Sequence, residues 1–186
     1  MPRLLPAALT ALALIVPAPP ATAAQTRKLP SESVWLADVH ADMVGSRAFL
    51  ADRVASAVAG ERLAINLDID NTSLATHYAP QQPVRVVRRF ARFAHRHGVA
   101  VFFNTGRDDT EAAKMQRLLG KAGFPVDRVC TRHVDEDVVV SKQRCRQSFV
   151  DSGFTVVANV GNRSTDFVGS DYERAFRLPS YGNKLS

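Results

Sequence analysis

Apolar residues recur along this chain at two spacings, and the alternation between them predicts its secondary structure. The helical spacing of about three to four residues appears in several stretches, most of them followed by a glycine. Gly45 divides the first of these stretches into two helices, and Gly60 is expected to end the second. The expected helices span residues 31–59, 83–98, 110–119 and 142–151, with a short one near 165–169.

Short, continuous apolar runs lie between these helices and have the length of buried strands. The expected strands are 63–67, 99–103, 126–130, 154–160 and 174–178, with a weaker candidate at 137–140. Strands that alternate with helices of ten to fifteen residues are typical of a parallel sheet with helices on both faces. We therefore expect a three-layer, Rossmann-like α/β fold, which binds ligands beyond the carboxyl ends of its strands.

The first 24 residues have the pattern of a secretory signal peptide. Arg3 supplies a positive charge, residues 4–16 are apolar, and residues 21–23 (Ala-Thr-Ala) fit the small-residue cleavage pattern. The apolar stretch would rise only about 20 Å as a helix, against a hydrocarbon core of roughly 30 Å. We expect cleavage near Ala23/Ala24, secretion to the extracellular space or cell envelope, and no membrane span in the mature chain.

Length and composition limit the remaining organisation. A chain of 186 residues with 46% hydrophobic and 23% charged residues is not a disordered, collagen-like or disulfide-scaffold protein. We expect an N-terminal helical extension over 25–59 and one domain over 60–186.

The net charge of +6 raises nucleic-acid binding as an alternative function. The arginines of helix 83–98 fall on one face, opposite its apolar residues, and no aromatic side chains interleave with them to stack on bases. We interpret this face as the solvated side of an amphipathic helix and expect no nucleic-acid partner. Its members are Arg85, Arg88, Arg89, Arg92 and Arg96.

Two cysteines leave two possibilities open. Outside the cytosol, Cys130 and Cys145 could form a disulfide, which would stabilise the fold by about 3 kcal/mol. The alternative is a pair of buried thiols in a packed strand and helix.

Polar residues follow the expected strands at their carboxyl ends. Asp68 and Asp70 come directly after the first strand, and two close carboxylates repel unless a cation lies between them. Magnesium suits such an oxygen-only site, although an Asp-x-Asp pair alone also fits a turn or a helix cap. The second strand ends in residues 104–107 (Asn-Thr-Gly-Arg), which could form an anion-binding turn or a simple capped turn.

Two later segments add a cation and further oxygen donors. Lys142 follows the acidic run 135–137 near a helix start, where a cation gains nothing from the helix dipole, so we expect it to face a ligand. The fourth strand is followed by Gly161, Asn162 and, four residues later, Asp166.

In this order, the patterns D-x-D-x-T, strand-T-G-R, Lys and strand-G-N-x-x-x-D resemble the haloacid dehalogenase (HAD) superfamily over about residues 60–180. The chain looks most similar to the class B-like secreted acid phosphatases, which end in a related R-x-F-K-L-P-N run. Arg177 and Ser180 replace the Lys and the Asn of that run. The segments that carry this likeness are LDIDNTSLA, FFNTGR, SKQRCRQSFVDSGF, ANVGNRSTDFVG and RAFRLPSYGN.

The resemblance implies a secreted, Mg²⁺-dependent phosphomonoesterase. Asp68 would be the nucleophile that forms an aspartyl-phosphate, and Asp70 the general acid and then the general base. Lys142 and Mg²⁺ would neutralise the charge of the phosphate. Thr105 and the amide of Gly106 would hold the phosphoryl oxygens.

Arg107 could assist in phosphate binding or pin its loop by a salt bridge. The implied metal ligands are Asp68, Asp70 through its backbone carbonyl, Asn162 and Asp166. One departure concerns the metal, because the acid phosphatase branch usually has Asp where this chain has Asn162. The site loses a negative charge there, for which Asp166 could compensate. The lipin-like branch, which is regarded as catalytic, has the same G-N-R, and because Asp68 and Asp70 are both present we expect an active enzyme. A catalytically weak protein with a phosphate-binding or storage role, and a lipid phosphate phosphatase, remain as alternatives.

The space between the first two motifs is too short for a large cap domain. It holds only residues 73–82, expected as a flap, and helix 83–98. His77 and Tyr78 of the flap could touch a substrate, or serve in solvation or packing. We expect Trp35 in the core, small phosphomonoesters as substrates, and no indication of the oligomeric state.

Overall fold

The computed structural model describes residues 28–185. The expected signal peptide, residues 1–24, and its cleavage point lie outside the described residues. Across residues 28–185, no helix is both long enough and apolar enough to pass through a lipid bilayer.

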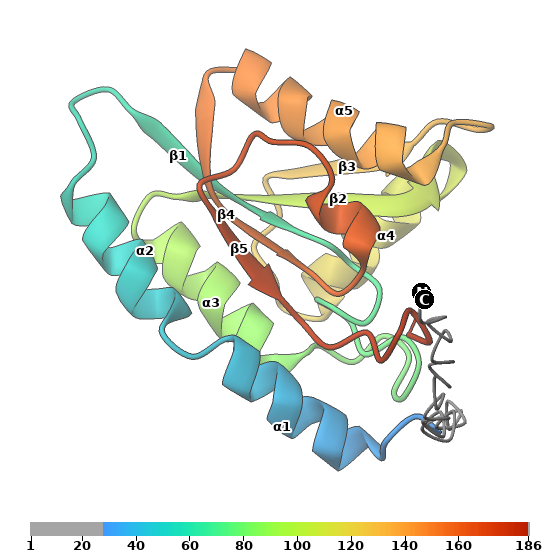
Figure 1. The fold of residues 1–186 in the computed structure, drawn as a ribbon. Coiled ribbons are helices and arrows are strands. Elements are labelled where there is room, and N and C mark those ends of the chain that lie inside the picture. Colours follow the sequence, from blue (N-terminus) through green and yellow to red (C-terminus); the bar gives the residue numbers. More distant parts are fainter. Residues whose placement is uncertain (1–27, 186) are drawn as a thin grey trace, which may run out of the picture.

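A five-stranded, entirely parallel sheet forms the centre of the fold (Figure 1). Its order is β3-β2-β1-β4-β5, and the central strand β1 pairs with β2 and β4. Leu67, at the end of β1, lies opposite Phe103 and Val160, so the carboxyl ends of the three inner strands meet at one edge. The strands are β1 (Arg62–Leu67), β2 (Ala100–Asp108), β3 (Arg128–Arg132), β4 (Phe154–Gly161) and β5 (Arg174–Arg177).

Helices cover both faces of the sheet, as the sequence predicts (Figure 1). In Figure 1, α5 lies above the sheet, and α2 and α3 lie below it. The helices are α1 (Glu32–Asp42), α2 (Ser46–Ala55), α3 (Arg85–Arg96), α4 (Ala112–Lys121) and α5 (Val138–Asp151), with 3-10 segments η1 (Asp109–Glu111) and η2 (Ser164–Phe167). The three-layer α/β fold is therefore confirmed, and the segment between β1 and α3 is too short to hold a large cap.

The strand β1 is apolar from Leu63 to Leu67 except at Asn66, because both of its faces are covered. Ile65 and Leu67 belong to the buried cluster that includes Phe90 of α3, whereas Ala64 packs in a second cluster with Phe149 of α5. Alternate residues of the same strand thus fill two separate cores.

The N-terminal helices α1 and α2 belong to the larger of these cores. Trp35 of α1 is fully buried and stacks on Tyr78 of the flap, with 5.0 Å between ring centroids. Phe49 of α2 meets Phe176 of the edge strand β5, with 6.0 Å between the ring centroids. Trp35 is therefore a core residue, and Tyr78 has a packing role.

Some expected element boundaries are wrong. The weak strand candidate at 137–140 is the start of α5, because the Asp137 side chain accepts hydrogen bonds from the amides of Val139 and Val140 and caps the helix. Lys142 consequently lies in the second turn of α5. The short helix near 165–169 is the 3-10 segment η2.

Two of the helix ends that the sequence predicts at glycines also differ from the structure. Gly45 separates α1 from α2 in a left-handed conformation, as predicted, but α2 ends at Ala55, before Gly60. Gly120 lies inside α4, and the left-handed residue that follows this helix is Gly123, with φ of +82°.

The arginine face of α3 is only partly a solvated surface. Arg88 donates to the carbonyl of Ala122 at 3.0 Å, and Arg92 donates to that of Gly123 at 2.8 Å. These two side chains satisfy carbonyls at the end of α4, where the helix leaves them without internal partners.

A disulfide joins Cys130 of β3 to Cys145 of α5. The alternative of two buried thiols is therefore wrong. The bond links the edge of the sheet to the helix that carries Lys142.

Candidate active site

The residues singled out at the strand ends meet around a cavity of about 290 Å³ at the carboxyl edge of the sheet. The cavity lining includes six of the expected site residues: Asp68, Asp70, Gly106, Arg107, Lys142 and Asp166. Thr105 and Asn162 are buried beside the cavity and do not line it.

The ammonium group of Lys142 is the centre of the site. Its Nζ lies 2.6 Å from Asp68 Oδ1 and 2.8 Å from Asp166 Oδ1, and it donates to the carbonyl of Asn104 at 2.6 Å. The Lys142 side chain is 4% exposed, so the ion pairs act with little screening by water. A lysine from α5 thus holds carboxylates that follow two different strands.

This arrangement shifts the pKa values of Asp68 and Lys142. Burial and the neighbouring charge of Asp166 raise the pKa of Asp68 to about 7, against the opposing effect of Lys142. Burial by itself would lower the pKa of Lys142, but the carboxylates of Asp166 and Asp68 outweigh it and raise that pKa, so the lysine stays charged.

Asp70 is held by a two-pronged salt bridge. Arg107 Nε lies 2.8 Å from Asp70 Oδ2, and Arg107 Nη2 donates to Asp70 Oδ1 at 2.9 Å. Thr76 of the flap donates to Asp70 Oδ1 at 2.7 Å, and Arg107 also pairs with Glu111. Burial works to raise the pKa of Asp70, but the hydrogen bonds from Arg107 and Thr76 prevail and lower it. In this structure, Arg107 joins the end of β2 to Asp70.

The two buried site residues contact the loops around the cavity. Asn162 Nδ2 donates to the carbonyl of Leu185 at 2.9 Å, which leaves its amide oxygen to accept from the hydroxyl of Thr72 at 3.5 Å. Thr105 Oγ1 accepts from the amide of Arg107 at 3.2 Å. Asn162 therefore turns its oxygen toward the segment that carries the first motif.

Three further polar residues line the cavity, and the sequence analysis did not single them out: Thr76, Arg163 and Thr165. Arg163 Nε and Thr165 Oγ1 are buried, and neither has a hydrogen-bond partner among residues 28–185. Both residues lie inside the G-N-x-x-x-D motif, between Asn162 and Asp166, and this position in the sequence could have indicated that they line the site.

A chain of buried amides supports the site from within the sheet. Asn66 Nδ2 donates to Asn159 Oδ1 at 2.6 Å, and Asn159 Nδ2 donates to the carbonyl of Asp166 at 2.8 Å. Asn104 Nδ2 donates to the carbonyl of Lys142 at 2.8 Å. Because each asparagine interrupts an apolar strand, these positions were visible in the sequence as buried polar groups that need partners.

The donors near Lys142 include no three-carboxylate metal cluster. Across residues 28–185, no group of three or more His, Cys, Asp or Glu side chains is arranged to hold a metal ion. The available donors are oxygens of several kinds: the carboxylates of Asp68 and Asp166, backbone carbonyls and the amide oxygen of Asn162, which accepts from Thr72 at 3.5 Å. Such a mixed, all-oxygen set fits a hard divalent cation.

Comparison with known families identifies the chain. A family model described as "HAD superfamily, subfamily IIIB (Acid phosphatase)" matches residues 77–184, more than half of the sequence. The chain belongs to this acid phosphatase family of the HAD superfamily. It is accordingly a phosphatase. The matched region begins after Asp68 and Asp70, so the family match does not include these two carboxylates.

Solved structures of acid phosphatases share the fold. The class C acid phosphatase from Bacillus anthracis has a TM-score of 0.66 at 14% identity, over 81% of this chain and 80% of that one. The structure of that enzyme with tungstate bound has a TM-score of 0.64 at the same identity and coverage. At this identity the likeness concerns the fold alone. Comparison with curated proteins gave no match.

Proposed function

We propose that this phosphatase is a secreted, Mg²⁺-dependent phosphomonoesterase that acts through an aspartyl-phosphate on Asp68. The observation that carries the proposal is the buried ammonium of Lys142, which lies within 2.8 Å of both Asp68 and Asp166 at the wall of an open cavity. A fixed cation beside a carboxylate nucleophile lowers the repulsion between that nucleophile and an anionic phosphate.

The proposed reaction has two steps. A carboxylate oxygen of Asp68 attacks phosphorus, the bond from phosphorus to the ester oxygen breaks, and Asp70 gives its proton to the leaving alcohol. For this step Asp70 must leave its ion pair with Arg107 and take up a proton from solvent, which the lowered pKa of its carboxyl opposes and an acid pH favours. Asp70 then takes a proton from water, which attacks phosphorus, releases inorganic phosphate and restores Asp68. Lys142 balances the phosphoryl charge, and Arg163, with its unpartnered Nε, is available to a phosphoryl oxygen.

Mg²⁺ would be held by Asp68, the backbone carbonyl of Asp70 and Asn162, with Asp166 as a direct or water-mediated partner. When bound, the ion would neutralise phosphate charge and favour the ionised form of Asp68. Asp166 has a second role, because its carboxylate fixes the Lys142 ammonium.

Two observations support secretion. The first residues have the composition of a signal peptide, and Cys130 and Cys145 form a disulfide, a bond that persists in oxidising compartments. The cavity does not favour a storage role, because it joins the carboxylates and the cation that hydrolysis requires.

The test is hydrolysis of p-nitrophenyl phosphate by the mature chain, with Mg²⁺ or with EDTA. We expect activity with Mg²⁺, its loss with EDTA, and a fall of about a thousandfold or more in Asp68→Asn. The matched control is Asp52→Asn on α2, which removes an exposed carboxylate and should keep full activity. Equal, negligible rates for wild type and Asp68→Asn over about pH 5–8 would rule out the proposal.

Asn162→Asp tests the metal site. An added negative charge at a ligand strengthens the binding of a divalent cation, so this variant should reach half-maximal activity at a lower Mg²⁺ concentration. An unchanged Mg²⁺ dependence would place residue 162 outside the coordination sphere.

A further inference from the structure

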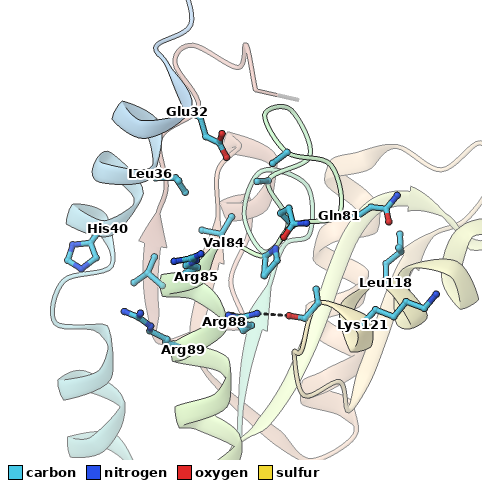
Figure 2. A pocket seen from close by; sticks show the side chains of 16 residues that line it. Glu32, Leu36, His40, Gln81, Val84, Arg85, Arg88, Arg89, Leu118 and Lys121 are labelled. Carbon is cyan, nitrogen blue, oxygen red and sulfur yellow. Dashed lines mark hydrogen bonds between the residues drawn. The ribbon is translucent and has the colours of Figure 1, made fainter.

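A second cavity, larger than the catalytic one, lies behind the flap. It encloses about 680 Å³, within the range of about 300–1,000 Å³ that is usual for small-molecule sites. Figure 2 shows side chains from α1, α3 and the end of α4 arranged around this common space, with the flap beside them.

The lining of this cavity is strongly basic. It contains four permanently charged cations and one carboxylate, that of Glu32. The cations are Arg85, Arg88, Arg89 and Lys121, all labelled in Figure 2. Arg88 donates to a backbone carbonyl, and within residues 28–185 Arg85, Arg89 and Lys121 have no ion-pair or hydrogen-bond partner. Guanidinium groups without partners are suited to bind a carboxylate or a phosphate.

The same cavity also offers apolar surface. Leu36 of α1, 37% exposed, and Val84 and Leu118 line it together with Ala75 and Ala79 of the flap. Cations on apolar walls match a ligand that has an aliphatic body and an anionic group.

A third cavity lies between this one and the catalytic one. It has about 170 Å³ and shares Asp70, Thr76 and Arg107 with the catalytic cavity. It also shares Gln81 and Leu118 with the large basic cavity. Asp70, the residue that would protonate the leaving alcohol, therefore lines the catalytic cavity on the side of the basic one.

We propose that the basic cavity is the leaving-group subsite of the enzyme. It takes a phosphomonoester whose alcohol part is an aliphatic chain with a second anionic group at its far end. The phosphate would lie at Asp68, the chain would pass Thr76 and Leu118, and the distal anion would meet Arg85 and Arg89. The reaction stays the hydrolysis of the ester to an alcohol and inorganic phosphate, so this inference rests on the proposed function and adds its substrate class.

The experiment compares two series of alkyl phosphates, from butyl to dodecyl and below their micellar concentrations. One series ends in a carboxylate and the other in a methyl group, and p-nitrophenyl phosphate serves as the short reference. The variant is Arg85→Glu/Arg89→Glu, which reverses two exposed charges that have no ion pair or hydrogen bond within residues 28–185. Its matched control is Arg96→Glu, an exposed arginine of the same helix that does not line the cavity.

We expect kcat/KM of the wild type to favour the carboxylate series by about tenfold at its best chain length, the size of one good charged contact. The double variant should lose this preference, mainly through KM, while p-nitrophenyl phosphate hydrolysis stays unchanged. Arg96→Glu should behave as wild type.

Two kinds of failure are distinguishable. Normal hydrolysis of p-nitrophenyl phosphate with no preference for the carboxylate series, or with a preference that the double variant retains, would overturn the subsite alone. Absence of p-nitrophenyl phosphate hydrolysis would overturn the proposed function, and with it the leaving-group role of the cavity.

Discussion

The buried guanidinium of Arg146 offers the sharpest test of how the site is held together. This α5 side chain is fully buried and donates to the carbonyls of Asp166 at 2.9 Å and of Ser170 at 3.0 Å. It also donates to the carbonyl of Val168 and, at 2.7 Å, to Gln143 Oε1. One cation thus satisfies three backbone carbonyls of the segment that carries Asp166.

Replacing Arg146 by Met keeps most of the side-chain volume and removes every one of these donors. A carbonyl left without a partner costs about 1–3 kcal/mol, and those of Val168 and Ser170 lose their donor, whereas Asn159 still donates to the carbonyl of Asp166. The desolvation cost of the arginine disappears at the same time, so we expect a net loss of about 2–4 kcal/mol in the free energy of unfolding. That is a large part of the roughly 5–15 kcal/mol that is usual for a domain.

Urea unfolding with the disulfide intact measures this loss, beside Arg117→Met as the control. Arg117 is exposed on α4 and has no ion pair or side-chain hydrogen bond within residues 28–185, so its replacement should change stability by less than about 0.5 kcal/mol. Activity should fall in Arg146→Met as well, because Asp166 would no longer be fixed beside Lys142. A loss below about 1 kcal/mol in Arg146→Met would show that the segment after β4 holds its conformation without the guanidinium.

Two further predictions concern stability. Removal of the disulfide in Cys130→Ala/Cys145→Ala should lower the free energy of unfolding by about 3 kcal/mol, because the bond closes a short loop. Urea unfolding of this variant beside the oxidised wild type measures the loss. Equal unfolding midpoints for the two proteins would refute this prediction. Hydrogen bonding to Arg144 lowers the pKa of Glu136 from 4.5 to about 2, so its contribution to stability is complete above pH 4.5 and is lost as the pH falls toward 2. The stability advantage of wild type over Glu136→Gln should therefore be present at neutral pH and vanish near pH 2, as thermal unfolding at several pH values would show; an advantage independent of pH would contradict this origin.

Much of the site could be predicted because parallel strands bring their carboxyl ends to one edge. Asp68, Gly106 and Asp166 are far apart in the sequence, but each lies within a few residues of the carboxyl end of an apolar run, and the structure places them around one cavity. The prediction from the local residue pattern was wrong at residues 137–140, where three consecutive valines suggested a strand. A single capping side chain, Asp137, decided that this segment begins α5.

The sequence by itself determined the order of strands and helices, the two faces of β1, and the polar residues at the strand ends, because these depend on the periodicity of neighbouring residues. Only the tertiary structure decided the ion pair between Arg107 and Asp70, the disulfide between β3 and α5, and the basic cavity between α1, α3 and α4. Each of these joins side chains from different elements, and their distances depend on how helices pack on the sheet. Residue spacing along the chain contains no information of that kind.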